Sequence, residues 1–257
     1  MANTQDTKSS VDQAFDILEF LKHSRRPVSL KEIAAALNMP KSSVHGLITK
    51  LVHQNVATQD PHTGMYNLGI RLLELGNSFV LSQDIIAYSR QVMQTISDKC
   101  MVSVHLMAAK YPEVVLIASA EPSNVRMKLV MSIGTACPMY NNAAGRVFLA
   151  KLSDAQLRCY AKSMTYKAYT QYSCRSPENL ISRIEACRRK GYGEDHNERN
   201  IGMHGIAFPV YNIHGEIEYT LSTCGIINRS EKSIVNSMIR ETKAGASMLS
   251  RYLGYTE

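Results

Sequence analysis

The sequence contains no tryptophan and no apolar run near the roughly eighteen residues that a membrane-spanning helix needs. Residues 1–10 lack the apolar core of a signal peptide, so we expect them to form a flexible leader and the chain to stay in the cytosol. Low-complexity tracts and internal repeats are also absent, which argues against fibrous and solenoid architectures. A chain of 257 residues then corresponds to one large domain or two ordinary ones.

Several signatures of metal sites and enzymes are missing as well. The six cysteines form no C-x-x-C pair and no histidine pair has metal-ligand spacing, so we expect reduced thiols and no bound metal. No P-loop, G-x-S-x-G elbow or dinucleotide fingerprint occurs, so no cofactor is expected. An enzyme built on a Cys–His pair stays open as an alternative, although no spacing orients its candidate residues: Cys224 with His196, His204 or His214.

The net charge of +7 suggests a nucleic-acid partner, but its distribution weakens that argument. Residues 1–80 hold eight lysines and arginines against seven aspartates and glutamates, so most of the excess lies downstream. DNA binding by the N-terminal region therefore has to depend on a local cationic face and not on bulk charge.

Residues 29–51, SLKEIAAALNMPKSSVHGLITKL, predict two short helices joined by a tight turn. Ser29 and Glu32 match a capping box at the start of the first helix. Pro40 separates the two helices, because proline suits only the first turn of a helix. The second helix has a single apolar stripe, formed by Val44, Leu47, Ile48 and Leu51. This pattern indicates a helix-turn-helix.

The flanking residues extend the motif to a winged helix-turn-helix over residues 11–69. A preceding helix is predicted by an apolar face that could close a three-helix core, formed by Val11, Ala14, Leu18 and Leu21. After the motif, Asn55 fits a left-handed helix end, and residues 56–59 and 65–68 can pair around the turn at 60–64. A plain three-helix bundle would show the same apolar stripes, so periodicity alone leaves that alternative open.

The face of the second helix opposite its apolar stripe is polar and partly basic. Small hydroxyls and lysines can approach phosphates and base edges in a major groove without steric conflict. We assign phosphate contacts to Lys41 and Lys50, and base-edge contacts to Ser43 and His45. The predicted DNA-binding set also includes residues of the same face, the preceding loop and the wing: Arg25, Ser42, Thr49, His62 and Thr63.

A further helix is predicted over residues 69–82, with more apolar residues than one small face needs: Leu72, Leu73, Leu75, Phe79 and Val80. We interpret residues 70–84 as a linker helix that also packs against another subunit, which would make the protein at least a dimer. A plain core helix would explain the surplus nearly as well. Over residues 85–257, strands joined by short turns mix with helices, which predicts an α+β domain around an antiparallel sheet.

Three segments in order resemble the IclR family of bacterial transcriptional regulators, over roughly residues 10–254. The matching segments are MPKSSVHGLITKL with the later GMYNLGIRLLELG, then SIGTACPMYNNAAGRVFLA, and then GYGEDHNERNIGMHGIAFPVYNIHGEI. The resemblance implies a winged helix-turn-helix, a linker helix and a C-terminal GAF-like α/β effector-binding domain. It also implies a regulator, expected to be a repressor, that binds a palindromic operator in double-stranded DNA as a homodimer or homotetramer. Regulators of this family respond to small organic acids as effectors.

Two positions depart from the family pattern. Gly46 stands where an arginine is common in the recognition helix, which lowers helix propensity by about 1 kcal/mol relative to alanine and removes an expected DNA contact. Gly205 stands where many relatives have a cysteine that lines the effector pocket. A pocket without that side chain has room for a longer acid.

The effector site is predicted from the residues together with this resemblance. At the start of the helix after NNAAG, the backbone N–H groups of Ala143 and Ala144 can hold a carboxylate, although a tightly packed helix entry is the alternative. Asp195, after a glycine-rich bend, can accept a bond from a ligand hydroxyl, but a loop aspartate is more often a solvated cap. The resemblance adds further pocket residues: Leu129, Met203, Gly205, Ser222 and Cys224.

Overall fold

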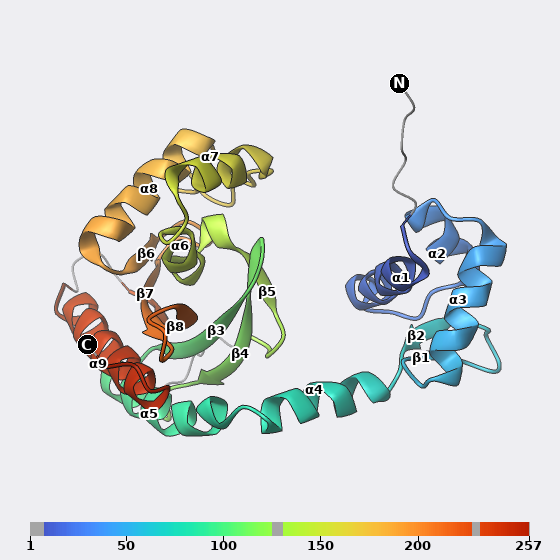
Figure 1. The fold of residues 1–257 in the computed structure, drawn as a ribbon, viewed down its shortest axis with the longest axis horizontal. Helices are drawn as coiled ribbons and strands as arrows, with labels where there is room; N and C mark the ends of the chain where they lie inside the picture. Colours follow the sequence, from blue (N-terminus) through green and yellow to red (C-terminus); the bar gives the residue numbers. More distant parts are fainter. Residues whose placement is uncertain (1–7, 125–130, 228–231, 257) are drawn as a thin grey trace. The chain divides into compact units, whose positions relative to one another are not determined.

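A computed structural model describes residues 8–124, 131–227 and 232–256 (Figure 1). The chain divides into two compact units, the first ending at Ser82 and the second beginning at Gln83. Within the described residues, no helix is both long and apolar enough to cross a membrane.

The first unit is a winged helix-turn-helix. Its elements are α1 (Ser10–Ser24), α2 (Leu30–Leu37), α3 (Lys41–His53), the antiparallel strands β1 (Ala57–Gln59) and β2 (Tyr66–Leu68), and α4 (Arg71–Leu81). The three helices and the hairpin enclose a small core that includes Ile17, Ile33, Val44, Ile48 and Tyr66. The predicted winged fold is therefore confirmed, because a plain bundle would lack the hairpin.

Local sequence accounts for the helix ends in this unit. The hydroxyl of Ser29 accepts the backbone N–H of Glu32 at 3.3 Å, and the carboxylate of Glu32 accepts the backbone N–H of Ser29 at 2.8 Å, which is the predicted capping box. Asn38 and Asn55 adopt the left-handed conformation with φ of 51° and 57°. The prediction that Val11 faces the core is wrong: α1 buries Ile17 and Leu21, and Val11 is 62% exposed near the start of the helix.

Helix α4 has no buried residue. Most of its large apolar side chains are exposed instead, with Leu75 at 55% and Phe79 at 52%, while Leu72 and Val80 are partly buried. An explanation of its apolar surplus as an ordinary core helix therefore does not fit the described residues. The start of the helix is attached to the end of α3, because Arg71 donates to the side chain of Gln54 at 2.6 Å.

The second unit is built around a six-stranded, wholly antiparallel sheet with the order β5-β4-β3-β8-β7-β6. The strands are β3 (Ser103–Lys110), β4 (Glu113–Ala120), β5 (Ala136–Pro138), β6 (Gly193–His196), β7 (Met203–Tyr211) and β8 (Ile217–Ile226). One face is covered by α5 (Asp84–Cys100) and α9 (Lys232–Tyr252). The other face carries the 3-10 turn η1 (Met139–Asn141), α6 (Ala143–Leu149), α7 (Asp154–Ser163) and α8 (Pro177–Lys190) (Figure 1).

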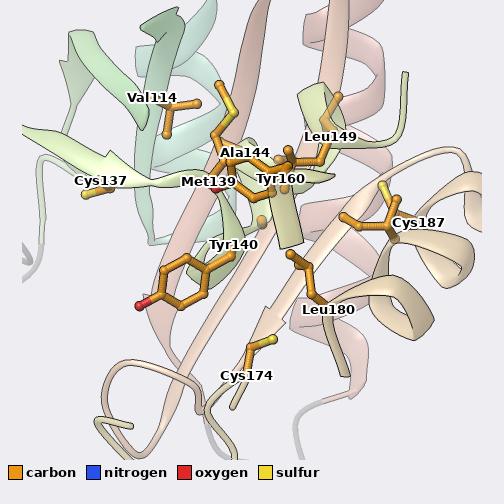
Figure 2. Close-up of a cluster of buried hydrophobic side chains, with 14 of the residues drawn as sticks. Val114, Cys137, Met139, Tyr140, Ala144, Leu149, Tyr160, Cys174, Leu180 and Cys187 are labelled. Atoms are coloured by element: carbon orange, nitrogen blue, oxygen red, sulfur yellow. The ribbon is translucent and has the colours of Figure 1, made fainter. Parts of the chain in front are cut away.

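The core on the α6 side holds that helix against the sheet. Buried apolar side chains from β4, β5, η1 and the helices α6 to α8 pack together, among them Val114, Met139, Leu149, Tyr160 and Leu180 (Figure 2). Close approach is essential here, because a Cβ on Gly145 would lie 2.3 Å from the Cα of Met139. The packing thereby fixes the start of α6 above the middle of the sheet.

Local sequence also accounts for helix ends in the second unit. Ser153 and Ser176 cap α7 and α8, and α8 ends at Gly191 with φ of 74°. The sequence did not reveal β5 or β6, which are short edge strands. Consequently the placement of Asp195 in a loop is wrong: it lies in β6 and pairs with Gly205 of β7.

Candidate DNA-binding face and ligand cavity

The exposed side of α3 carries the predicted DNA-contacting residues together. Val44 and Ile48 are buried, whereas every predicted contact residue of the helix is exposed: Lys41, Ser42, Ser43, His45, Thr49 and Lys50. Within the described part of the chain, neither Lys41 nor Lys50 forms an ion pair. The hydroxyl of Thr49 donates to the backbone carbonyl of His45 at 2.7 Å, so it can offer its oxygen to DNA only as an acceptor. Gly46 lies on the same open side, since a Cβ there would meet nothing within 4 Å.

The wing and the loop before α2 present the remaining predicted residues. Asp60 accepts the backbone N–H groups of His62 and Thr63 at 2.9 and 2.8 Å, which holds the tip of the hairpin. These backbone bonds lower the pKa of Asp60 below its usual value. The side chains of His62 and Thr63 are exposed, as is that of Arg25 at the left-handed end of α1. The neighbouring Arg26 is paired with Glu32 at 2.7 Å.

A cavity of about 250 Å³ lies between the sheet and the start of α6 in the second unit. It is lined by seven of the eight residues predicted for the effector site: Ala143, Ala144, Asp195, Met203, Gly205, Ser222 and Cys224. The eighth, Leu129, lies outside the described residues. Strand register explains why these residues meet, because Cys224 is opposite Gly205, which is opposite Asp195.

Gly205 leaves open space at the floor of the cavity. A Cβ on this residue would lie 3.6 Å from the Cβ of Asp195 and 3.7 Å from that of Ala143, which are ordinary contact distances. A longer side chain would therefore project between β6 and the start of α6. Because glycine has no side chain, the cavity is larger at the point where Asp195 and Ala143 face each other.

Asp195 is the acidic group of the cavity. Burial, and then the negative charge of Glu198, raise its pKa from 3.8 to about 6. One carboxylate oxygen accepts the backbone N–H of Glu198 at 3.2 Å. A carboxyl with this pKa can both accept and, when protonated, donate a hydrogen bond near neutral pH.

Several polar residues of the cavity were not predicted from the sequence, among them His105, Asn141 and Arg199. His105 on β3 and Asn141 at the end of η1 are buried, at 7% and 3% exposure, and the imidazole Nε2 and both polar atoms of the amide have no hydrogen-bond partner. Arg199 supplies a guanidinium, which donates to the sulfur of Cys137 at 3.2 Å and lies over the ring of Tyr169. No sequence signal distinguishes these residues from surface ones, because only the fold buries them.

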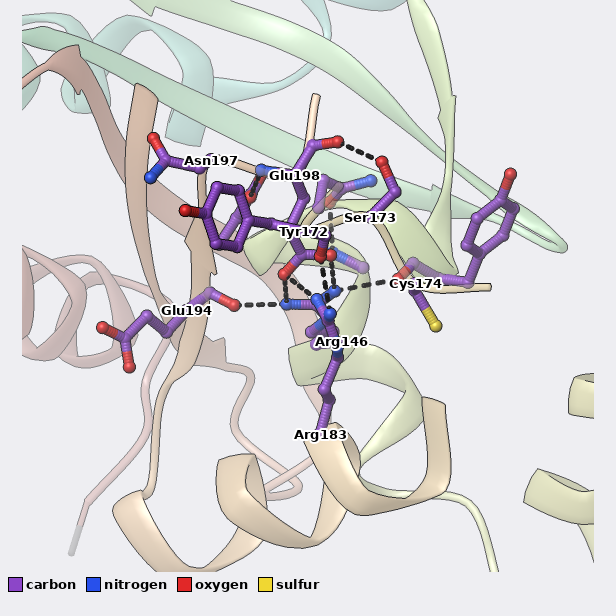
Figure 3. Close-up of polar contacts among 12 residues, drawn as sticks. Arg146, Tyr172, Ser173, Cys174, Arg183, Glu194, Asn197 and Glu198 are labelled. Carbon is purple, nitrogen blue, oxygen red and sulfur yellow. Dashed lines mark hydrogen bonds and ion pairs between the residues drawn. The ribbon is translucent and has the colours of Figure 1, made fainter. Parts of the chain in front are cut away.

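The loop that carries Arg199 is held by a buried ionic network (Figure 3). Arg146 of α6 binds the carboxylate of Glu198 with two hydrogen bonds, at 2.6 and 2.5 Å, and Arg183 of α8 pairs with the same carboxylate. Ser173 donates to the backbone carbonyl of Glu198 at 2.6 Å. The network joins α6, α8 and the segment after β6. It therefore fixes the backbone around Glu198, and with it the backbone positions of Asp195 and Arg199 on either side.

The geometry contradicts the alternative of a Cys–His enzyme. Burial raises the pKa of Cys224 to about 12, whereas a catalytic cysteine has to be a thiolate. The Nε2 atom of His204 is hydrogen-bonded to the carboxylate of Glu194 at 3.0 Å. His204 pairs in register with Gly225, so its side chain lies on the opposite face of the sheet from that of Cys224. His214 lies in the turn between β7 and β8, and the ring of His196 lies tilted against that of His204, with 5.0 Å between the ring centroids.

Comparison with known proteins identifies both units. Residues 77–251 match the sequence profile described as the bacterial transcriptional regulator IclR C-terminal domain, and residues 10–61 match the IclR helix-turn-helix domain. The HTH-type transcriptional regulator XynR of Escherichia coli is 27% identical, with 96% of this chain and 97% of that protein covered. The transcriptional repressor IclR of Escherichia coli is 26% identical over 86% of this chain and 81% of its own length.

Solved structures give the same result at the level of the fold. An IclR transcriptional regulator from Alicyclobacillus acidocaldarius superposes with a TM-score of 0.82 and 26% identity, covering 96% of this chain and all of that one. An IclR homologue from Microbacterium hydrocarbonoxydans, solved with 4-hydroxybenzoate, has a TM-score of 0.74 at 18% identity and covers 95% of this chain and all of that one. The matched domains and curated relatives are transcriptional regulators and not enzymes, so the enzyme alternative is wrong.

Proposed function

This chain belongs to the IclR family of DNA-binding transcriptional regulators, and we propose that it is a repressor whose operator affinity is controlled by a small organic acid in the cavity beside α6. The observation that carries the proposal is the cavity itself, because seven residues predicted for the effector site from the sequence and the family resemblance line it. A ligand alters DNA affinity only when it binds two conformations unequally, with a coupling of typically about 1–3 kcal/mol.

The operator contacts are proposed for the exposed side of α3 and the wing. Lys41 and Lys50 would contact phosphates, and Ser43 and His45 would read base edges in the major groove. Ser42, Thr49, Arg25, His62 and Thr63 would add contacts around them. Support comes from their exposure together on one side of the helix and the wing, with the apolar stripe turned into the core.

Removal of two phosphate-binding charges tests this assignment. Lys41→Ala with Lys50→Ala should weaken binding to operator and to unrelated DNA alike, and lower the salt slope by about one unit per lysine. The matched control is Lys162→Ala with Lys243→Ala, which removes two exposed charges of the second unit. Fluorescence anisotropy over a salt series measures both slopes. Normal operator binding by the first variant at physiological salt would show the assignment to be wrong.

The effector is proposed to be a carboxylate such as a keto, hydroxy or sugar acid. The backbone N–H groups of Ala143 and Ala144 and the guanidinium of Arg199 can hold its carboxylate. Asp195, Ser222 and Cys224 can bind its hydroxyls, and Met203 and Leu129 would complete the apolar wall. The Microbacterium homologue, whose structure contains an aromatic monocarboxylate, is consistent with this ligand class.

Asp195→Ala separates the ligand response from DNA binding. The variant should lose the response to the effector but bind operator without ligand nearly as wild type does, because Asp195 lies in the second unit and α3 in the first. Calorimetry with candidate acids, and gel shifts with and without them, measure the two properties. Asp154→Ala is the control, since it removes an exposed carboxylate outside the cavity. Equal affinity of wild type and Asp195→Ala for the effective acid would remove Asp195 from the site.

The assembly is proposed to be a homodimer or a dimer of dimers that uses the apolar side chains of α4. Leu75 and Phe79 are exposed one helical turn apart, as neighbours on the same side of a helix that buries nothing within its own unit. A dimer also supplies the two recognition helices that a palindromic operator requires.

A further inference from the structure

Two almost completely buried side chains of the cavity have polar atoms without hydrogen-bond partners. The Nε2 atom of His105 and both the Oδ1 and Nδ2 atoms of Asn141 form no hydrogen bond. Buried polar groups of proteins are nearly always hydrogen-bonded, because an unmade bond leaves their loss of water uncompensated. Both residues line the cavity, so a bound ligand can reach them.

The charges around the cavity limit what such a ligand can carry. Arg199 is the one cationic side chain among the described lining residues, and Asp195 is the one carboxyl. Burial also lowers the pKa of His105 to about 4, so its imidazole is neutral at physiological pH. A single cation suits a single carboxylate, and a neutral imidazole with a neutral amide suits an uncharged polar group.

The position of His105 requires an extended ligand. Ala143 lies above Gly205 of β7. His105 is on β3, which is the second strand from β7, with β8 between them. Adjacent strands are about 4.8 Å apart, so the two points are separated by roughly 10 Å along the floor. Met107, Met131 and Met203 line the cavity with flexible, polarizable apolar side chains.

We propose that His105 and Asn141 determine specificity by binding an uncharged hydroxyl or carbonyl of the effector, with His105 two strands away from the start of α6. A hydroxyl fits both residues, because it can donate to a neutral imidazole nitrogen and can accept from an amide. The effector is then an extended monocarboxylate with a neutral polar end, and not a dicarboxylate. This inference rests on the proposed function and adds to it the class of acid.

Two matched series of acids test the proposal by calorimetry on the full-length protein. The flexible series is hexanoate, 6-hydroxyhexanoate and adipate, and the rigid series is benzoate, 4-hydroxybenzoate and terephthalate. Within at least one series, the hydroxy acid should bind wild type about tenfold or more tightly than the acid without the hydroxyl, and the dicarboxylate should bind most weakly.

Variants identify the residues responsible. His105→Leu and Asn141→Leu should each reduce the preference for the hydroxy acid by about tenfold while the unsubstituted acid binds as before or more tightly. Their melting temperatures without ligand should be unchanged or higher, because an unpartnered polar group has been replaced by an apolar one. Asn141→Ala serves the same purpose if the larger leucine prevents folding.

Thr220→Val is the matched control. The hydroxyl of Thr220 is also buried without a partner, but this residue is not among the described residues that line the cavity. The control should keep the full preference for the hydroxy acid.

The possible outcomes distinguish this inference from the proposed function. Acids that bind wild type with no preference for the hydroxyl, or variants that keep the preference, would overturn the inference alone. A lower melting temperature together with equal loss of all acids would assign His105 and Asn141 a structural role and overturn it too. If none of the six acids bound wild type, the result would count against both the inference and the proposed effector site.

Discussion

Among single residues, Asp195 shows most directly how burial changes chemistry. Its pKa is 3.8 in the unfolded chain and about 6 in the folded one, because burial and the charge of Glu198 disfavour the carboxylate. The folded protein therefore binds this proton more tightly than the unfolded chain does. At acid pH the protonated carboxyl of Asp195 therefore stabilises the folded state relative to the unfolded chain. This contribution to the free energy of unfolding, about 3 kcal/mol in total, is lost as the pH rises from 3.8 through about 6.

Asp195→Asn should make the protein more stable at neutral pH. The amide oxygen can still accept the backbone N–H of Glu198, and the costly charge is gone. The advantage over wild type should grow by about 1–1.5 kcal/mol between pH 5 and pH 7.5, because wild type ionises in that interval. Urea unfolding at the two pH values measures the difference. A variant that is less stable than wild type at pH 7.5 would contradict the assigned pKa.

At the level of elements, α3 contains a glycine that its packing does not require. Gly46 is exposed and a Cβ there would meet nothing within 4 Å, in contrast to Gly145 of α6, where a Cβ would collide with backbone. Gly46→Ala should therefore stabilise the protein by about 1 kcal/mol. Gly46→Arg should give a similar gain, bind operator more tightly and raise the salt slope by about one unit.

Comparison of the two Gly46 variants separates helix stability from DNA contact. Thermal unfolding should move both in the same direction, whereas anisotropy titrations should show the steeper salt dependence for Gly46→Arg only. An unchanged salt slope in Gly46→Arg would mean that this side of α3 does not face phosphates.

At the scale of the whole molecule, the exposed apolar side of α4 is proposed to make the protein a dimer. Leu75→Glu with Phe79→Glu should yield a monomer by light scattering at micromolar concentration, because buried carboxylates oppose association. Operator affinity should fall with it, since a monomer offers one recognition helix to a two-fold site. Asn77→Glu, an exposed position between them in the sequence but turned to another side of α4, should remain a dimer. A wild-type monomer with intact operator binding would exclude this interface.

The sequence alone determined the elements whose signals are local. A capping box, a left-handed asparagine and a 3.6-residue apolar period indicated the helices of the first unit, and serine caps of the same local kind begin α7 and α8. Family resemblance then supplied the effector residues, seven of which the fold brings to one cavity, although their role there stays a prediction.

Tertiary structure decided the features that depend on distant parts of the chain. The edge strands β5 and β6 are too short for a period, so Asp195 could not be placed in a sheet from the sequence. The buried ionic network consists of Arg146, Arg183 and Glu198, which lie in separate segments of the sequence. Only folding brings these charged side chains together. The same holds for His105 and Asn141, because burial and a missing hydrogen-bond partner arise only when the chain is packed.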